Sequence, residues 1–130
     1  QKANDEIISL AMIETKEAFE NIDEILSVPE LTGIYVGPGD MSSSYGLKPS
    51  FDVKEDPVYS NIKTIAKKSH QFGKIAGIHN GSTEYAKEMI NIGYKFVTIS
   101  SDFRSMTTYA QSIINEMREI KDKESSSSTY

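Results

Sequence analysis

The chain has 130 residues, a formal net charge of -5, and a composition that is 38% hydrophobic and 25% charged. These values are typical of one globular domain, and the acidic balance disfavours a nucleic-acid-binding surface. The length lies below the ~200 residues of a complete (β/α)8 barrel, and no apolar run approaches the ~20 residues of a membrane helix. The chain has no cysteine, which excludes disulfides and thiolate metal sites.

The first part of the chain predicts two strands, each followed by a polar or helical segment. The apolar run Ile7–Glu14 predicts a buried strand, and Thr15 is a suitable cap for a helix over residues 16–28. Residues 33–37 predict the second strand, and the polar segment 41–56 predicts a long loop. The apolar face of the expected helix consists of Phe19, Ile22, Ile25 and Leu26.

A third strand and a second helix follow. Asp56 and Pro57 predict the start of a helix, with the acid as its cap and proline at its first position. Gly73 predicts the end of this helix, and residues 74–80 predict the third strand. The apolar positions of the helix are Ile62, Ile65, Ala66 and Phe72.

The last part of the chain predicts two more helices around a fourth strand. Ser82 and Gly93 predict the start and end of one helix, and residues 96–101 predict the strand. The final helix has an apolar stripe, and the serine-rich residues 123–130 predict a disordered tail. The stripe consists of Met106, Tyr109, Ala110, Ile113, Ile114, Met117 and Ile120.

Alternating strands and helices predict an α/β fold with a parallel sheet covered by helices. Ligands bind such sheets at the carboxyl ends of the strands. Glu14 and Asp40 close successive strands, and neighbouring strands lie ~4.8 Å apart. The two carboxylates can therefore share a hard divalent cation such as Mg²⁺ or Mn²⁺, although capping of the following helices explains them as well.

Gly37, Pro38 and Gly39 precede Asp40. Glycines let backbone N–H groups approach an anion, but a simple tight turn explains this tetrapeptide equally well. His79 stands at the end of the third strand, where it either lines a pocket or is purely structural. None of the expected strands ends in lysine, which disfavours a Schiff-base mechanism.

Two segments, MIETKEAFENIDEIL and LTGIYVGPGDMSSSYG, resemble the HpcH/HpaI family of metal-dependent class II pyruvate aldolases. The later segments GKIAGIHN and GYKFVTISSD are similar to the seventh and eighth barrel strands of that family. The resemblance extends roughly from Ala3 to Lys121. It implies that residues 1–122 are the C-terminal half of a TIM (β/α)8 barrel, from its fifth to its eighth strand–helix unit.

The resemblance also implies roles for individual residues. Glu14 and Asp40 match the acids that bind the divalent metal, which is Mg²⁺ or Mn²⁺, with Co²⁺ and Zn²⁺ as alternatives. Gly37, Gly39 and Asp40 match the turn that binds the pyruvate carboxylate through backbone N–H groups. His79 replaces a residue that is usually apolar near the aldehyde pocket. The implied reaction is cleavage of 4-hydroxy-2-oxo acids to pyruvate and an aldehyde through a metal-stabilised pyruvate enolate.

The catalytic base of the family, a histidine, and its enolate-stabilising arginine come from the other half of the barrel. Arg104 and Arg118 match neither position, so we expect no catalytic residue in this chain and no activity from it alone. The resemblance implies pyruvate and a small aldehyde or 2-oxo acid as substrates, a cytoplasmic location, and a homo-oligomer that binds neither nucleic acid nor membrane. Ser100 replaces a glycine of the family pattern.

Two alternatives stay open. One is a lyase of the same superfamily that acts on CoA esters, similar to the citrate lyase beta subunit. The other is a flavodoxin-like receiver domain, which fits the length and the alternation of strands and helices. The receiver is disfavoured because the last strand ends in Ser100, Ser101 and Asp102, without the required lysine.

Overall fold

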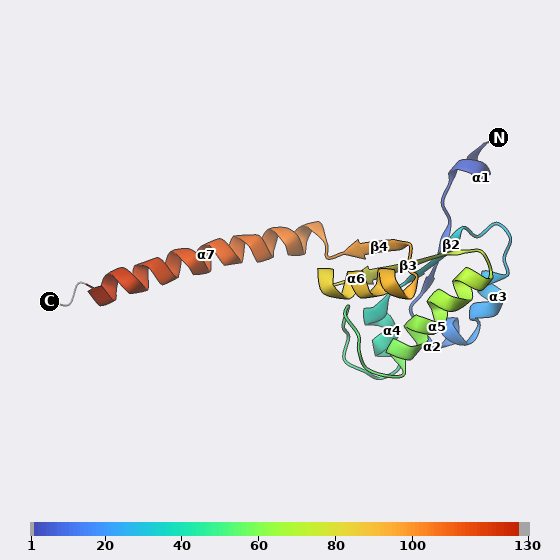
Figure 1. Ribbon diagram of the computed structural model, residues 1–130, viewed down its shortest axis with the longest axis horizontal. Coiled ribbons are helices and arrows are strands. Elements are labelled where there is room, and N and C mark those ends of the chain that lie inside the picture. Colours follow the sequence, from blue (N-terminus) through green and yellow to red (C-terminus); the bar gives the residue numbers. More distant parts are fainter. Residues whose placement is uncertain (1, 128–130) are drawn as a thin grey trace. The chain divides into compact units, whose positions relative to one another are not determined.

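A computed structural model describes residues 2–127 of the chain, with side chains described up to Arg118 except those of Asn4 and Asp5. The chain divides into two units, one ending at Ile99 and one beginning at Ser100. The second unit contains α7 (Asp102–Ser127). The first contains α1 (Ala3–Glu6), β1 (Leu10–Ile13), α2 (Lys16–Glu20), α3 (Ile22–Leu26), β2 (Gly33–Val36), α4 (Pro38–Ser44), α5 (Val58–Gln71), β3 (Ile75–Asn80), α6 (Thr83–Ile92) and β4 (Phe96–Ile99) (Figure 1).

The four strands form one parallel sheet in the order β1-β2-β3-β4. When each strand pairs with the next one along the chain through a right-handed crossover, all the connecting helices lie on the same face of the sheet. The other face carries no helix, like the inner face of a barrel sheet, and is called the open face below. A flavodoxin-like sheet reverses its strand order and carries helices on both faces, so the observed order contradicts the receiver alternative. The predicted α/β class with parallel strands is confirmed.

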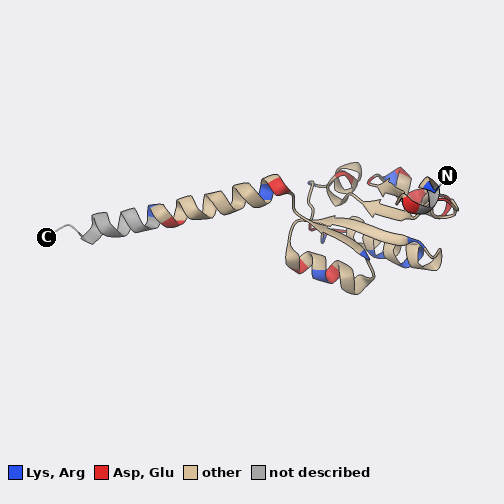
Figure 2. Cartoon of the chain, turned by 90° about the horizontal axis from the view of Figure 1, so that it is seen from above, with Lys and Arg blue, Asp and Glu red and all other residues tan. Residues whose placement is uncertain are grey.

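The hydrophobic core lies between the sheet and its helices. Ile34, Val36 and Ile78 on the covered face are fully buried. Burial of each such side chain contributes about 1.5–3 kcal/mol. The four strands contain no charged residue, and the charges of this unit lie on its helices and loops (Figure 2). The helices contribute Leu26, Ile62, Ile65 and Met89 to the same cluster.

The two predicted serine and threonine caps are confirmed. Thr15 Oγ1 accepts a hydrogen bond from the Ala18 N–H at 3.0 Å, and Ser82 Oγ accepts one from the Tyr85 N–H at 3.2 Å. Asp56 acts differently from the prediction, because α5 begins at Val58 and Pro57 is its N-cap residue. The Asp56 carboxylate still accepts a hydrogen bond from the backbone N–H of Ser60, at 3.1 Å.

Several predicted boundaries were wrong. The helix expected over 16–28 is interrupted at Asn21, whose φ of -97° and ψ of 15° separate α2 from α3. The first strand is shorter than Ile7–Glu14, since it begins at Leu10. Phe72, expected in the apolar face of α5, is 40% exposed because it follows the last turn of the helix.

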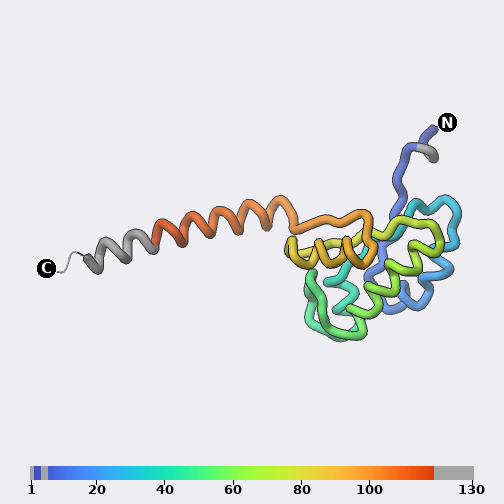
Figure 3. Tube along the Cα trace, viewed as in Figure 1, coloured from blue at the N-terminus to red at the C-terminus, as the bar shows by residue number. Residues whose placement is uncertain are grey.

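The largest correction concerns the expected loop over 41–56, because its first residues belong to α4. Pro38 occupies the first turn, and Met41 is buried on the core side. The serines suggested a loop, but their hydroxyls donate back to helix carbonyls. Ser42 Oγ donates to Pro38 O at 2.7 Å, and Ser44 Oγ donates to Met41 O at 2.8 Å. The loop is therefore limited to residues 45–57, drawn in green tones in Figure 3.

The second unit consists of the predicted last helix. Through Met117 its apolar residues follow the expected helical spacing, whereas Ile120 lies beyond the residues whose side chains are described. The helix extends to Ser127 and so enters the segment 123–130 for which we expected a tail, while residues 128–130 lie outside the described residues. Within residues 2–127, no helix is long and apolar enough to cross a membrane.

Candidate metal and substrate site at the strand ends

Glu14 and Gly37 follow β1 and β2 directly, at the carboxyl edge of the sheet. The Gly37 N–H donates to Ile13 O at 3.2 Å, which continues the β1–β2 pairing past the last strand residues. A Cβ added to Gly37 would lie 3.0 Å from Glu14 Oε2 and 3.1 Å from Glu14 Cβ. The Glu14 side chain therefore lies directly against Gly37, in space that only glycine leaves open at this position.

Asp40 lies in the first turn of α4, three residues after Gly37, and is exposed. Met41 is the first residue of this helix whose N–H has an acceptor within the turn, Gly37 O at 3.0 Å. The earlier N–H groups of a helix have no intrahelical acceptor. The N–H groups of Gly39 and Asp40 thus lie at the positive end of the α4 dipole, which favours an anionic ligand.

The donor set of this edge fits a hard divalent cation. Glu14 and Asp40 both supply carboxylate oxygens, the ligands that Mg²⁺ prefers when water and substrate oxygens complete its coordination. Among the described residues, no group of three or more histidine, cysteine or acidic side chains is arranged to hold a metal. The protein can thus contribute two ligands from this edge, leaving the remaining positions to water and substrate.

His79 belongs to a hydrogen-bonded cluster that sequence reasoning did not find. Its Nδ1 lies 2.9 Å from Thr98 Oγ1 and 3.4 Å from the Tyr35 hydroxyl. The Tyr35 hydroxyl also bonds to Thr98 Oγ1. Tyr35, His79 and Thr98 lie on β2, β3 and β4, on the open face of the sheet. The period-two alternation of the strands was the signal that could have placed Tyr35 and Thr98 beside His79.

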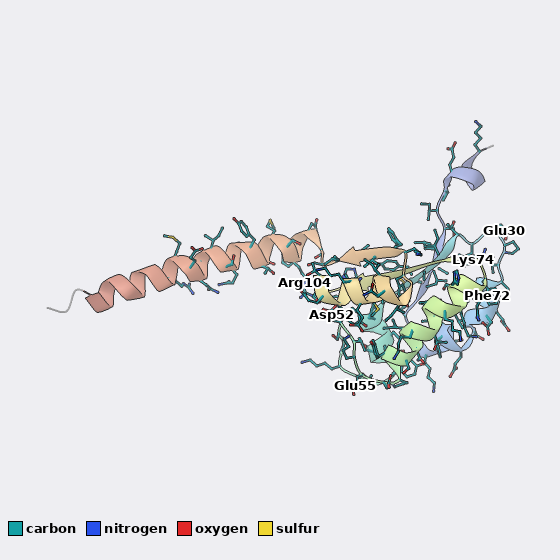
Figure 4. The ribbon with its side chains drawn as sticks, viewed as in Figure 1. Glu30, Asp52, Glu55, Phe72, Lys74 and Arg104 are labelled. Atoms are coloured by element: carbon teal, nitrogen blue, oxygen red, sulfur yellow. The ribbon has the colours of Figure 1, made fainter. Side chains whose placement is uncertain are left out.

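The loop over residues 45–57 packs against the same edge. Asp52 Oδ1 accepts hydrogen bonds from the N–H groups of Gly81 at 2.7 Å and Ser82 at 3.4 Å, between β3 and α6 (Figure 4). The Phe51 ring contacts the His79 ring edge-on, with a centroid distance of 4.8 Å and an interplanar angle of 76°. The loop therefore carries one aromatic side chain onto the open-face cluster and one carboxylate onto the start of α6.

Further contacts fasten the loop to α6. The Tyr85 hydroxyl donates to Val53 O at 2.7 Å, and Lys54 bonds to Glu88. The hydrogen bond from Lys54, followed by one from Tyr59, lowers the pKa of Glu88. A pocket of about 500 Å³ is lined by Ser42 and residues of the segment 47–55, but it includes none of the predicted site residues.

The residues after β4 belong to the second unit, which begins at Ser100. Ser100 has a φ of 59°, in the left-handed region that glycine adopts most easily. Its backbone thus has a conformation that a glycine adopts at less cost than a serine does. Asp102 Oδ1 accepts a hydrogen bond from the Phe103 N–H at 2.7 Å, within the first turn of its own helix.

Residues 1–108 match the HpcH/HpaI aldolase/citrate lyase family. The chain belongs to this family. It is 38% identical over 117 residues to the hydroxypyruvate/pyruvate aldolase of Rhizorhabdus wittichii, covering 90% of this chain and 47% of that protein. It is 30% identical over 113 residues to a 4-hydroxy-2-oxo-heptane-1,7-dioate aldolase of Escherichia coli, covering 87% of this chain and 42% of that protein. The chain thus spans less than half the length of either relative.

Two solved structures share the fold of this chain. The HpcH/HpaI aldolase of Desulfitobacterium hafniense matches with a TM-score of 0.82 and 25% identity, over 89% of this chain and 44% of that one. The citrate lyase beta subunit of M. tuberculosis, in complex with oxaloacetate and magnesium, matches with a TM-score of 0.61 and 18% identity, over 74% of this chain and 48% of that one. The chain therefore has the fold of a part of these longer proteins.

Proposed function

We propose that this chain is the metal-binding, C-terminal half of a class II aldolase that cleaves 4-hydroxy-2-oxo acids into pyruvate and an aldehyde. Four further strands would complete its barrel and cover the open face of the sheet. Apolar side chains on that face support the proposal, since Met12 is 53% exposed and Phe96 is 47% exposed. Apolar side chains gathered on one face of a sheet mark a surface that another part of a protein covers.

The observation that carries the proposal is the contact of Glu14 with Gly37, three residues before Asp40. These residues belong to neighbouring parallel strand ends, where α/β enzymes bind their ligands. Glu14 and Asp40 would hold Mg²⁺ or Mn²⁺. Such a cation supplies Lewis-acid polarisation of the carbonyl oxygen of a 2-oxo acid.

The chain's own backbone would bind the other end of the substrate. The N–H groups of Gly39 and Asp40 donate to the carboxylate of the 2-oxo acid, and the absence of a Cβ at Gly39 lets the anion approach them. We assign the transfer of the substrate hydroxyl proton to the other half of the barrel, because no described residue matches the catalytic base. The chain alone is then expected to bind metal without retro-aldol activity.

The test uses Glu14→Ala and Asp40→Ala in the complete barrel protein that contains this chain. Each variant should lose Mn²⁺ affinity and retro-aldol rate together, because each removes one of only two charged ligands. Glu30→Ala is the matched control, since Glu30 is an exposed acid before β2, at the opposite edge of the sheet (Figure 4). Unchanged affinity and rate in both site variants would refute the proposal. Comparison of free acids with CoA esters distinguishes the aldolase from the CoA-ester lyase.

A further inference from the structure

One row of residues crosses the open face at the carboxyl ends of the strands. His79 pairs with Thr98, and the β1–β2 and β2–β3 registers, continued by one residue, add Gly37 and Glu14 to this row. Glu14 and His79 are thus two strand spacings apart, roughly 10 Å between backbones. Gly37 lies between them without a side chain. A ligand held at Glu14 can therefore extend across Gly37 to His79.

Tyr35 lies on β2, two residues before Gly37, and so in the preceding row of the open face. Its side chain reaches the row of His79 because the neighbouring residue on β3 is Gly77, which has no side chain. Tyr35 pairs with Gly77, and a Cβ added to Gly77 would lie only 2.7 Å from Tyr35 Cδ2. The Tyr35 ring therefore lies across β3, and its hydroxyl reaches Thr98 Oγ1 on β4. A larger residue than glycine at position 77 would displace the ring from this path.

The hydrogens of the two hydroxyls favour one of the two positions for the proton of the His79 ring. Among the described residues, His79 Nδ1 and Thr98 Oγ1 are the only partners of the Tyr35 hydroxyl. When Tyr35 donates to Thr98 and Thr98 donates to Nδ1, both hydroxyl hydrogens are used. When Nδ1 donates instead, one hydroxyl hydrogen has no acceptor within the cluster. The first arrangement leaves the proton of neutral His79 on Nε2, on the side of the ring away from Thr98.

Phe51 restricts the His79 ring from another side. Its ring meets the His79 ring edge-on at 4.8 Å, and it also lies 3.7 Å from the position of a Cβ on Gly39. Phe51 therefore connects the histidine with the first turn of α4, where the substrate carboxylate is proposed to bind. With Nδ1 bonded and the imidazole packed against the Phe51 ring, the orientation of the imidazole is fixed before any ligand binds.

We propose that His79 selects the aldehyde substrate by donating a hydrogen bond from Nε2 to an oxygen substituent beside the aldehyde carbon. Tyr35 and Thr98 are positioning residues that fix this tautomer. The inference rests on the proposed function, since it concerns the second substrate of the same site. Hydroxylated aldehydes are favoured over alkyl aldehydes of equal size, because an alkyl group leaves the Nε2 donor unpaired.

The first experiment measures the tautomer directly. The chain contains two histidines, His70 and His79, so His70→Gln leaves a single imidazole for ¹⁵N NMR. At about pH 8 we expect a protonated Nε2 and an unprotonated Nδ1. Thr98→Val should shift the Nδ1 signal, and Thr98→Ser should restore it. A protonated Nδ1 in the otherwise unchanged cluster would overturn the inference.

The second experiment measures selectivity in the complete barrel protein. Glycolaldehyde and propanal differ only by a hydroxyl in place of a methyl group. We expect kcat/KM to favour glycolaldehyde by about tenfold or more, and His79→Leu to abolish the preference. Tyr35→Phe and Thr98→Val should weaken it, mainly through the KM of glycolaldehyde. His70→Gln, on an exposed position of α5, should leave it unchanged.

Exchange of the pyruvate methyl protons with deuterated water separates the two proposals, because it needs no aldehyde. If the unaltered protein does not catalyse this exchange, the proposed function is refuted and the inference with it. Exchange that persists in His79→Leu, together with an unchanged preference for glycolaldehyde, would overturn the inference alone. If His79→Leu still catalyses the exchange but no longer prefers glycolaldehyde, both the proposed function and the inference are supported.

Discussion

Substitution of Gly37 by alanine tests the metal site without changing its charge. The added Cβ would lie 3.0 Å from Glu14 Oε2 and 3.1 Å from Glu14 Cβ, about half an ångström less than the ~3.5 Å at which such atoms pack without strain. The Glu14 carboxylate must then turn away, or the ends of β1 and β2 must separate. Metal sites tolerate ligand displacements of only about 0.2 Å, so either response disturbs the site.

We therefore expect Gly37→Ala to weaken Mn²⁺ binding by about 10- to 100-fold, as loss of a supporting contact around a metal site typically does. This corresponds to about 1.4–2.8 kcal/mol of binding free energy. Isothermal titration calorimetry measures the affinity, and a thermal unfolding curve shows whether the fold persists. Gly39→Ala is the matched control for metal affinity, because its added Cβ meets only the Phe51 ring, at 3.7 Å. Equal Mn²⁺ affinity in the unaltered chain and both variants would refute the reasoning.

Three further predictions concern stability. Gly33→Ala should lower the free energy of unfolding in urea by about 3 kcal/mol, since its Cβ would lie 2.1 Å from the carbonyl oxygen of Ile75 on the paired strand. Lys74→Met should lower it by about 2 kcal/mol, because the Lys74 ammonium donates to three carbonyl oxygens, those of Val28 at 2.9 Å, Pro29 at 3.0 Å and Leu31 at 2.6 Å. Glu88→Gln should lower the melting temperature at neutral pH but not in acid. The hydrogen bond from Lys54 holds the pKa of Glu88 below its ordinary 4.5, so its stabilisation is present above that pH and disappears as the pH falls through the folded-state pKa.

Each of these predictions has its own control. A Gly33→Ala variant as stable as the unaltered chain would mean that β2 and β3 can separate there without losing their pairing. Lys67→Met, on an exposed position of α5, should change the urea midpoint little, and an equal effect from Lys74→Met would contradict the role of the carbonyl contacts. A stability difference between Glu88→Gln and the unaltered chain that does not depend on pH would exclude the Lys54 contact as its cause.

The sequence by itself determined the class of the fold and the candidate metal ligands. Apolar runs alternate with helical periods, and Thr15 and Ser82 cap the helices that they were expected to cap. These signals are local, since a cap or an apolar face depends on residues only a few positions apart. Glu14 and Asp40 could be singled out for the same reason, because Glu14 directly follows β1 and Asp40 lies four residues after the end of β2.

The tertiary structure decided what depends on residues far apart in the chain. Only the register of the strands places Glu14 against Gly37 and brings Tyr35 and Thr98 to His79. The helix α4 was missed because serines favour loops unless their hydroxyls bond to helix carbonyls, as Ser42 does here. The strand order likewise excluded a sheet covered on both faces, since pairing between strands is a long-range choice that local periodicity does not encode.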